Sequence, residues 1–472
     1  MKKYLVLLFL TGTASVFAQK NEVIKSLNAK TVKYSTIAMQ IWDWAEVGYQ
    51  EEQSSALLKS ELSAAGFEIN SGVADIPTAF VAEYGSGAPV IAILAEFDAL
   101  PGVSQKAIPS REPVIEGGAG HACGHHLFGT ASIAAGIEVK NWLQENKSAG
   151  TIRVYGTPAE EGGAGKVYMV RAGLFDDVDA VLHWHPGNSN NANPGASLAN
   201  KSAKFRFYGE ASHAAASPER GRSALDGVEA MNHMVNMLRE HVPEATRIHY
   251  VITKGGEAPN VVPAFAEVFY YVRNPEVSNV KTIFEKVVKC AEGAALGTNT
   301  EMKYEVIHGL YNLLPNETLS EIMYKNLQEV GGVEYSSDDV QFGEKILATY
   351  SGDYALSSAN EIQPYMIQSG KSFGSTDVGD VSWAVPTAGM SAATWVPGTS
   401  AHTWQAVAAG GTSIGTKGMM VAAKTIALSA IDIFKTPEVT DKAKSELADR
   451  QGKDFVYEAL IGDREPPLDY RK

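Results

Sequence analysis

The N-terminal half of the chain alternates short apolar runs with longer stretches of helical periodicity. Three runs, at residues 89–101, 151–163 and 178–186, are rich in apolar residues and end in acidic residues or histidines. Such runs are typical of strands buried on both faces of a sheet. Residues 23–44, 51–65 and 127–144 instead carry apolar residues at helical spacing. This alternation predicts an α/β fold with a mostly parallel central sheet covered by helices.

A different rhythm extends from about residue 201 to residue 308. Its pattern predicts a strand at 204–210, a helix at 223–241, strands at 248–253 and 264–273, a helix at 277–296 and a strand at 302–307. This β-α-β-β-α-β order is the ferredoxin-like arrangement. We therefore expect residues 201–309 to form an inserted α+β domain, and residues 19–200 and 310–472 to form one discontinuous α/β domain. A long helix is expected from about residue 402 to residue 433.

The first 18 residues have the layout of a secretory signal peptide, with two lysines, an apolar run and small residues at Val16 and Ala18. We expect cleavage after Ala18, export to the periplasm or the medium, and no membrane anchor, because the apolar run is too short to span a bilayer. The formal net charge of −14 argues against a nucleic-acid partner. Only Cys123 and Cys290 are present, so we do not expect disulfides to stabilise the fold.

Side chains that bind metals gather in four segments: HACGHH at 121–126, PAEEGG at 158–163, HWHPG at 183–187 and GTSAHTWQ at 398–405. Taken singly, each segment is more often structural, as a histidine-rich loop, a solvated acidic turn or a pair of buried histidines. In α/β sheets, however, ligands collect at the carboxyl ends of the strands. Asp98, Glu160, Glu161 and His185 all fall at such ends, which favours a shared metal site.

Two of these segments offer a choice of ligand. Adjacent side chains diverge at a sheet edge, so one of Glu160 and Glu161 can bind a metal while the other takes a proton from water. His183 and His185 point to the same side of their strand, so one can be a ligand and the other its support. Both histidines can equally be structural.

The order Cys-x-His, Glu-Glu, His and a distant His in AHTWQ resembles the M-20 peptidase family of aminoacylases, carboxypeptidases and amidohydrolases. It is most similar to the branch in which cysteine replaces a bridging aspartate and which includes hydrolases of p-aminobenzoyl-glutamate. HACGHHLFGTAS and GSTDVGDVSW, the latter at 374–383, carry the likeness further, and it extends from about residue 42 to the last long helix. The resemblance implies a zinc-exopeptidase-like catalytic domain, with these metal ligands: Cys123, His125, Glu161, His185 and His402.

The same resemblance assigns roles to other residues. It makes Glu160 the general base and Asp98 a support of the ligands that does not itself bind the metal. Residues 209–227 resemble a family segment in which the histidine, here His213, stabilises the oxyanion. Asn260 would contact the substrate, and Arg273 would hold its carboxylate through two hydrogen bonds.

Three residues keep open roles. His126 stands where relatives often have aspartate, and its role is undecided. Asp377 and Asp380 lie in the 374–383 segment, where they either hold the loop or support the site.

The resemblance implies a metal-dependent amidohydrolase that cleaves the amide bond of N-acyl amino acids such as p-aminobenzoyl-glutamate. It implies two divalent ions per subunit, with zinc favoured by the mixed ligands and manganese, cobalt or nickel as alternatives. The insert would act as a lid with hinges near 199–203 and 308–312, and would also form a homodimer. The alternatives are a dipeptidase or exopeptidase of the same fold, and a non-catalytic binding protein.

Overall fold

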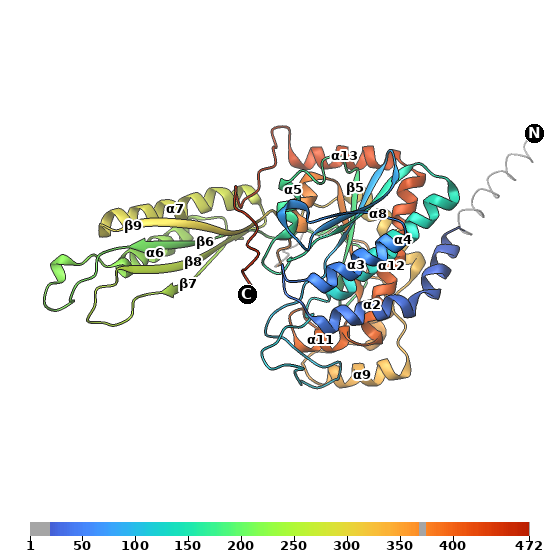
Figure 1. Cartoon of the computed structure of the whole chain (residues 1–472), viewed down its shortest axis with the longest axis horizontal. Coiled ribbons are helices and arrows are strands. Elements are labelled where there is room, and N and C mark those ends of the chain that lie inside the picture. The colour runs from blue at the N-terminus through green and yellow to red at the C-terminus, as the bar shows by residue number, and fades with distance from the viewer. Residues whose placement is uncertain (1–18, 368–373, 472) are drawn as a thin grey trace, which may run out of the picture.

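The computed structural model describes residues 19–367 and 374–471, and the expected signal peptide lies outside these ranges. Two β-sheets organise this part of the chain (Figure 1). The larger sheet has the order β1-β2-β4-β3-β5-β10 and the smaller one the order β7-β8-β6-β9. The strands of the larger sheet are β1 (Glu68–Ser71), β2 (Phe80–Ser86), β3 (Val90–Ala95), β4 (Gly150–Gly156), β5 (Ala180–Gly187) and β10 (Thr387–Ala393).

The larger sheet is mostly parallel, as predicted. Strand β3 pairs in parallel with β4 and β5, and β5 pairs in parallel with β10. Strands β1 and β2 extend one side of the sheet in antiparallel pairing. Every apolar side chain of Ile91–Ala95 in β3 is buried, because this strand lies inside the sheet with helices against it.

Helices precede, cover and follow this sheet. Their bounds are α2 (Thr31–Trp44), α3 (Glu52–Ala64), α4 (His125–Asn146), α5 (Gly165–Arg171), α8 (Glu317–Val330), α9 (Ser337–Leu347), α10 (Val378–Ala384), α11 (Trp404–Gly410), α12 (Ser413–Lys435) and α13 (Glu438–Gln451). Helices α4 and α12 pack side by side, and α4 contacts β3, β4 and β5. None of the helices in the described ranges combines the length and the apolarity that crossing a membrane requires.

Two expected helices are each divided in the structure. The helix expected at 23–44 breaks at Lys30, whose ψ of 5° is not helical, so residues 19–29 and α2 are separate. The helix expected at 402–433 breaks between α11 and α12. Gly410 and Gly411 favour the break because glycine weakens a helix. The hydroxyl of Thr412 then caps α12 by accepting from Ile414 N at 3.3 Å.

The smaller sheet belongs to an insert that projects from the rest of the chain (Figure 1). Its elements are β6 (Ala199–Tyr208), α6 (Ala224–Leu238), β7 (Arg247–Lys254), β8 (Phe265–Asn274), α7 (Val277–Thr298) and β9 (Glu301–Leu310). Their order and antiparallel pairing are those of the predicted ferredoxin-like arrangement. The two helices and the inner sheet face, including Phe205, Phe207 and Tyr270, form a hydrophobic core separate from that of the larger sheet.

Candidate metal centre

The turn before α4 brings Cys123 and His125 to the carboxyl end of β5. Gly124 adopts a left-handed conformation (φ 76°), and a Cβ there would lie 2.7 Å from Cβ of Pro186. Only glycine fits such a close approach without strain. Because Pro186 follows His185, this contact sets the turn directly against the histidine.

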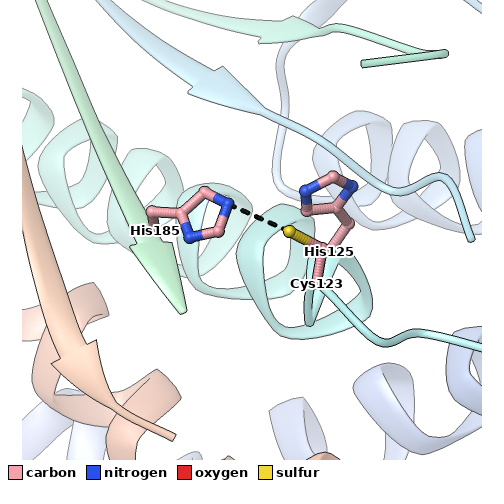
Figure 2. Close-up of side chains that lie close together, drawn as sticks. All are labelled: Cys123, His125 and His185. Carbon is pink, nitrogen blue, oxygen red and sulfur yellow. Dashed lines mark hydrogen bonds between the residues drawn. The ribbon is translucent and has the colours of Figure 1, made fainter. Parts of the chain in front are cut away.

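Five of the candidate ligands come together in two groups that share one thiol. Cys123 Sγ lies 3.4 Å from His185 Nε2, and the two side chains point toward each other beside the ring of His125 (Figure 2). The ligand atoms of these three residues all lie within 4.8 Å of one another. A second group of the same compactness joins Cys123 to Glu161 and His402.

His402 reaches this centre from a different part of the chain. It has a positive φ of 62°, and its backbone N–H donates to the carbonyl of Ala122 at 3.0 Å. Its Nε2 lies 3.2 Å from Glu161 Oε1, and this carboxylate raises the pKa of His402. The neighbour of His185 in β5, His183, is outside both groups and lies over Gly389 of β10.

Asp98 contacts one member of each ligand group and holds both in place. Its Oδ1 lies 2.9 Å from Nδ1 of His125, and its Oδ2 accepts from the backbone N–H of Glu161 at 2.9 Å. Burial by itself would raise the pKa of Asp98, but His125 and these hydrogen bonds hold that pKa below its ordinary value. One carboxylate therefore orients a histidine and a glutamate that belong to different groups.

A buried chain of charges behind His125 was missed by the sequence analysis. Glu96 Oε2 lies 3.1 Å from Nε2 of His125, and Glu96 Oε1 lies 2.7 Å from the ammonium of Lys166. The same ammonium lies 2.7 Å from Oδ1 of Asp377. Two features of the sequence pointed to these buried charged side chains. Glu96 is two residues from Asp98, and Lys166 is a charged residue within an apolar segment.

The two aspartates of the 374–383 segment have different roles. Asp377, through Lys166, belongs to the charged chain behind the metal centre. Asp380 instead accepts from the backbone N–H of Tyr311, just beyond β9, at 3.0 Å and from the hydroxyl of Tyr457 at 2.8 Å. Asp377 thus supports the site, whereas Asp380 holds the chain where it leaves the insert.

Glu160 belongs to neither group, but its carboxylate lies within 4.8 Å of ligand atoms of His125 and Glu96 in a third cluster. Burial, together with the carboxylates of Glu96, Glu161 and Asp377, raises the pKa of Glu160 well above its ordinary range. A carboxyl group whose pKa is raised toward neutrality is suited to take up and return a proton.

His121 and His126 are structural. His126 Nε2 lies 3.1 Å from the carbonyl of Gly410 in α11, and His121 Nε2 lies 3.0 Å from that of Ile41 in α2. Burial lowers the pKa of both imidazoles, to about 4 in His121, so both are neutral at pH 7. The open question of His126 is thereby answered: it ties α4 to α11.

Two of the expected substrate contacts of the insert, His213 and Asn260, are remote from this centre within one chain. His213 forms an isolated bridge with Val261, and the N–H of Ala214 donates to the carbonyl of Asn260 at 3.0 Å. These residues lie in the loop after β6 and the loop between β7 and β8, at the end of the insert that points away from the larger sheet (Figure 1). Arg273, near the end of β8, lies over the ring of Tyr271 at 5.3 Å. The structure thus does not bring His213 and Asn260 to Glu160 in a single subunit.

Comparisons with known proteins agree with this arrangement. The model of peptidase family M20/M25/M40 matches residues 92–406. The chain is 43% identical to a p-aminobenzoyl-glutamate hydrolase subunit of Escherichia coli, over 89% of this chain and 93% of that protein. It is 30% identical to a mouse Xaa-Arg dipeptidase, over 92% and 94% of the two chains.

Among solved structures, the fold is similar to that of a dinuclear metal-binding M20 peptidase from Bacillus subtilis. The TM-score is 0.60 at 18% identity, and the match covers 87% of this chain and 99% of the other. The chain belongs to peptidase family M20/M25/M40 and is a hydrolase that acts on amide bonds.

Proposed function

We propose that this protein is a metal-dependent amidohydrolase of N-acyl amino acids, with p-aminobenzoyl-glutamate as a representative substrate. The observation that carries the proposal is the pair of ligand groups sharing Cys123, with Glu160 outside both of them and close to His125. The identity of 43% to a p-aminobenzoyl-glutamate hydrolase subunit supports the substrate class.

The residues present fit two divalent cations. Cys123, His125 and His185 would hold one ion, and Cys123, Glu161 and His402 would hold the other, with the thiol shared. His125 Nε2 and Glu161 Oε1 are buried, and neither makes a well-aligned hydrogen bond with its nearest polar neighbour, which is Glu96 Oε2 at 3.1 Å for the first and His402 Nε2 at 3.2 Å for the second. One thiol, three imidazoles and one carboxylate form a donor set that suits zinc, and also cobalt, nickel or manganese. A bound divalent cation supplies Lewis acidity toward water and toward a carbonyl oxygen.

The protein's own residues then move the proton. Glu160 accepts it from the attacking water and returns it to the departing amine, so that the C–N bond is replaced by a C–O bond and an N–H bond. Asp98 keeps His125 and Glu161 aligned during this exchange. The raised pKa of Glu160 makes it the stronger base for the first of these two transfers.

We further propose that His213 and Asn260 act either after closure of the insert or from the insert of a second copy. Strand β7 pairs only with β8 within the four-stranded sheet, which leaves its other edge for a partner. Val251 and Ile252 on this strand are 56% and 41% exposed. A homodimer formed through this edge would bury them.

Complementation of two inactive variants distinguishes closure from exchange between subunits. Glu160→Gln and His213→Ala protein are mixed, dissociated and reassociated. If His213 acts across a dimer, the mixture recovers part of the activity, because one active centre in each mixed dimer is intact. If closure within one chain is enough, the mixture stays as inactive as its components. Sedimentation equilibrium measures the dimer directly.

The substrate assignment is tested with purified protein reconstituted with defined metals. N-acyl and N-aroyl glutamates are compared with dipeptides that carry a free amine. We expect kcat/KM to be highest for the acylated amino acids. A preference for dipeptides would instead favour the second candidate, a dipeptidase, for which the 30% identity to an Xaa-Arg dipeptidase is the supporting observation. Tight binding without turnover would favour a binding protein. Export, which we also propose, is tested by cell fractionation.

A further inference from the structure

The loop that carries both glutamates has an unusual backbone. Ala159 and Ala164 have positive φ values of 58°, and Gly162 has one of 97°. For an alanine the left-handed conformation is unfavourable, because its Cβ lies too close to the backbone carbonyl oxygen. Such a conformation persists only where neighbouring groups enforce it. The groups that hold this loop therefore decide where Glu160 and Glu161 point.

Part of the restraint comes from the segment between α2 and α3 and from the segment that follows β3. The hydroxyl of Tyr49 donates to the carbonyl of Gly163 at 2.7 Å. The buried carboxylate of Glu51 accepts from the backbone N–H of Ala159 at 2.8 Å. Asp98 accepts from the N–H of Glu161, as described above.

The remaining restraint comes from residues 452–471, the segment that follows α13. The hydroxyl of Tyr470 donates to the carbonyl oxygen of Glu161 at 3.1 Å, and Arg471 Nη2 donates to the same oxygen at 2.8 Å. The guanidinium of Arg471 lies over the ring of Tyr470, which packs edge-on against Tyr49 at 5.6 Å between centroids. The Glu161 backbone is thus held at its N–H by Asp98 and at its carbonyl by this segment.

Hydrogen bonds from other parts of the chain hold residues 452–471 in place. They thereby fix the positions of the two donors, Tyr470 and Arg471. Arg171 in α5 donates to the carbonyls of Gly462 and Arg464 at 2.7 and 2.8 Å. The side chain of Gln50 donates to the carbonyl of Leu468 at 2.8 Å. These bonds hold the C-terminal segment against Gln50 and α5, beside the loop that carries Glu160 and Glu161.

We propose that Tyr470 and Arg471 are positioning residues that fix the Glu161 backbone and so aim the carboxylates of Glu160 and Glu161. The inference rests on the proposed function for its effect on catalysis. Neither residue touches the reacting atoms, because both act on the backbone of the loop. A group misplaced by about 1 Å can lose about 100-fold in rate.

The test uses full-length protein with Tyr470→Phe, Arg471→Met and the double substitution. The matched control is Lys453→Met, which removes a positive charge from an exposed position of the same segment. We expect the double variant to lose about tenfold to 100-fold in kcat, with a smaller change in KM. Its metal content and unfolding midpoint should equal those of the control. Arg471→Lys, which keeps a charged donor, should recover part of kcat.

Hydrogen–deuterium exchange of peptides spanning 159–164 gives a readout that needs no substrate. We expect faster exchange in the double variant than in Lys453→Met. Unchanged exchange and unchanged kcat would overturn the proposal. If the wild-type protein hydrolyses no acylated amino acid or dipeptide, the proposed function fails, while the exchange experiment still decides whether this segment restrains the loop.

Discussion

Lys166 and Asp377 are joined twice: the ammonium lies 2.7 Å from Oδ1, and the backbone N–H of the same lysine donates to Oδ2 at 2.9 Å. Both side chains are fully buried, as is that of Glu96 on the other side of the ammonium. Lys166 therefore fixes two carboxylates in the interior, and one of these, Glu96, also lies against His125.

Removing this cation should destabilise the fold strongly. We expect Lys166→Met to lower the free energy of unfolding by about 3–5 kcal/mol, because uncompensated charges remain buried. Adding Asp377→Asn should recover part of the loss. Denaturant unfolding measures both. The control is Lys33→Met, which breaks a largely exposed pair with Glu61 and should cost no more than about 1 kcal/mol. Equal losses in the two lysine variants would contradict the assignment.

The number of bound metal ions should depend on Cys123 more than on any other single ligand, because both ligand groups contain its thiol. We expect Cys123→Ala to lower the retention of both ions, because its thiol belongs to both ligand groups. His185→Ala and His402→Ala should each weaken one ion and leave the other bound. Elemental analysis after dialysis against a weak chelator gives the stoichiometry of each variant. If Cys123→Ala protein kept two ions as firmly as the wild type, the shared thiol would be excluded.

Glu160→Gln should separate catalysis from metal binding. We expect kcat to fall by about 10²- to 10⁴-fold, the range typical of general acid–base catalysis, while both ions stay bound. Glu161→Gln, by contrast, should lose metal as well as activity, because this carboxylate belongs to the second ligand group. A Glu160→Gln variant with wild-type turnover would show that another group moves the proton.

Asp380 should make stability depend on pH. Burial raises its pKa to about 7, despite the hydrogen bonds from Tyr311 and Tyr457. Because the folded state holds this proton more tightly than the unfolded chain, the contribution is complete below about pH 4 and is lost as the pH rises through about 7. Asp380→Asn should therefore gain stability relative to the wild type between pH 4 and pH 8. Denaturant unfolding at a series of pH values measures this difference, and parallel pH profiles would refute it.

The sheet and the insert were predictable because their signals are local: apolar runs mark the strands, and a change of periodicity marks β6 to β9. The convergence of Glu161 and His185 was also predictable, because β4 and β5 are parallel strands on either side of β3 and their carboxyl ends lie at the same edge of the sheet. The break at Gly411 was overlooked within a continuous apolar pattern. Lys166 and Asp377 lie about two hundred positions apart in the sequence. Neither segment carries a local pattern that identifies the other as its partner, so their pairing could not be predicted.

The hydrophobic core of the insert is separate from the core beneath the metal centre, and the chain enters and leaves it through β6 and β9. Substitutions among its inner residues, such as Phe205 and Tyr270, repack the insert without disturbing the side chains under Cys123 and His125. Over evolutionary time, descendants of one ancestor can therefore change the packing inside the insert while inheriting the same hydrolytic chemistry.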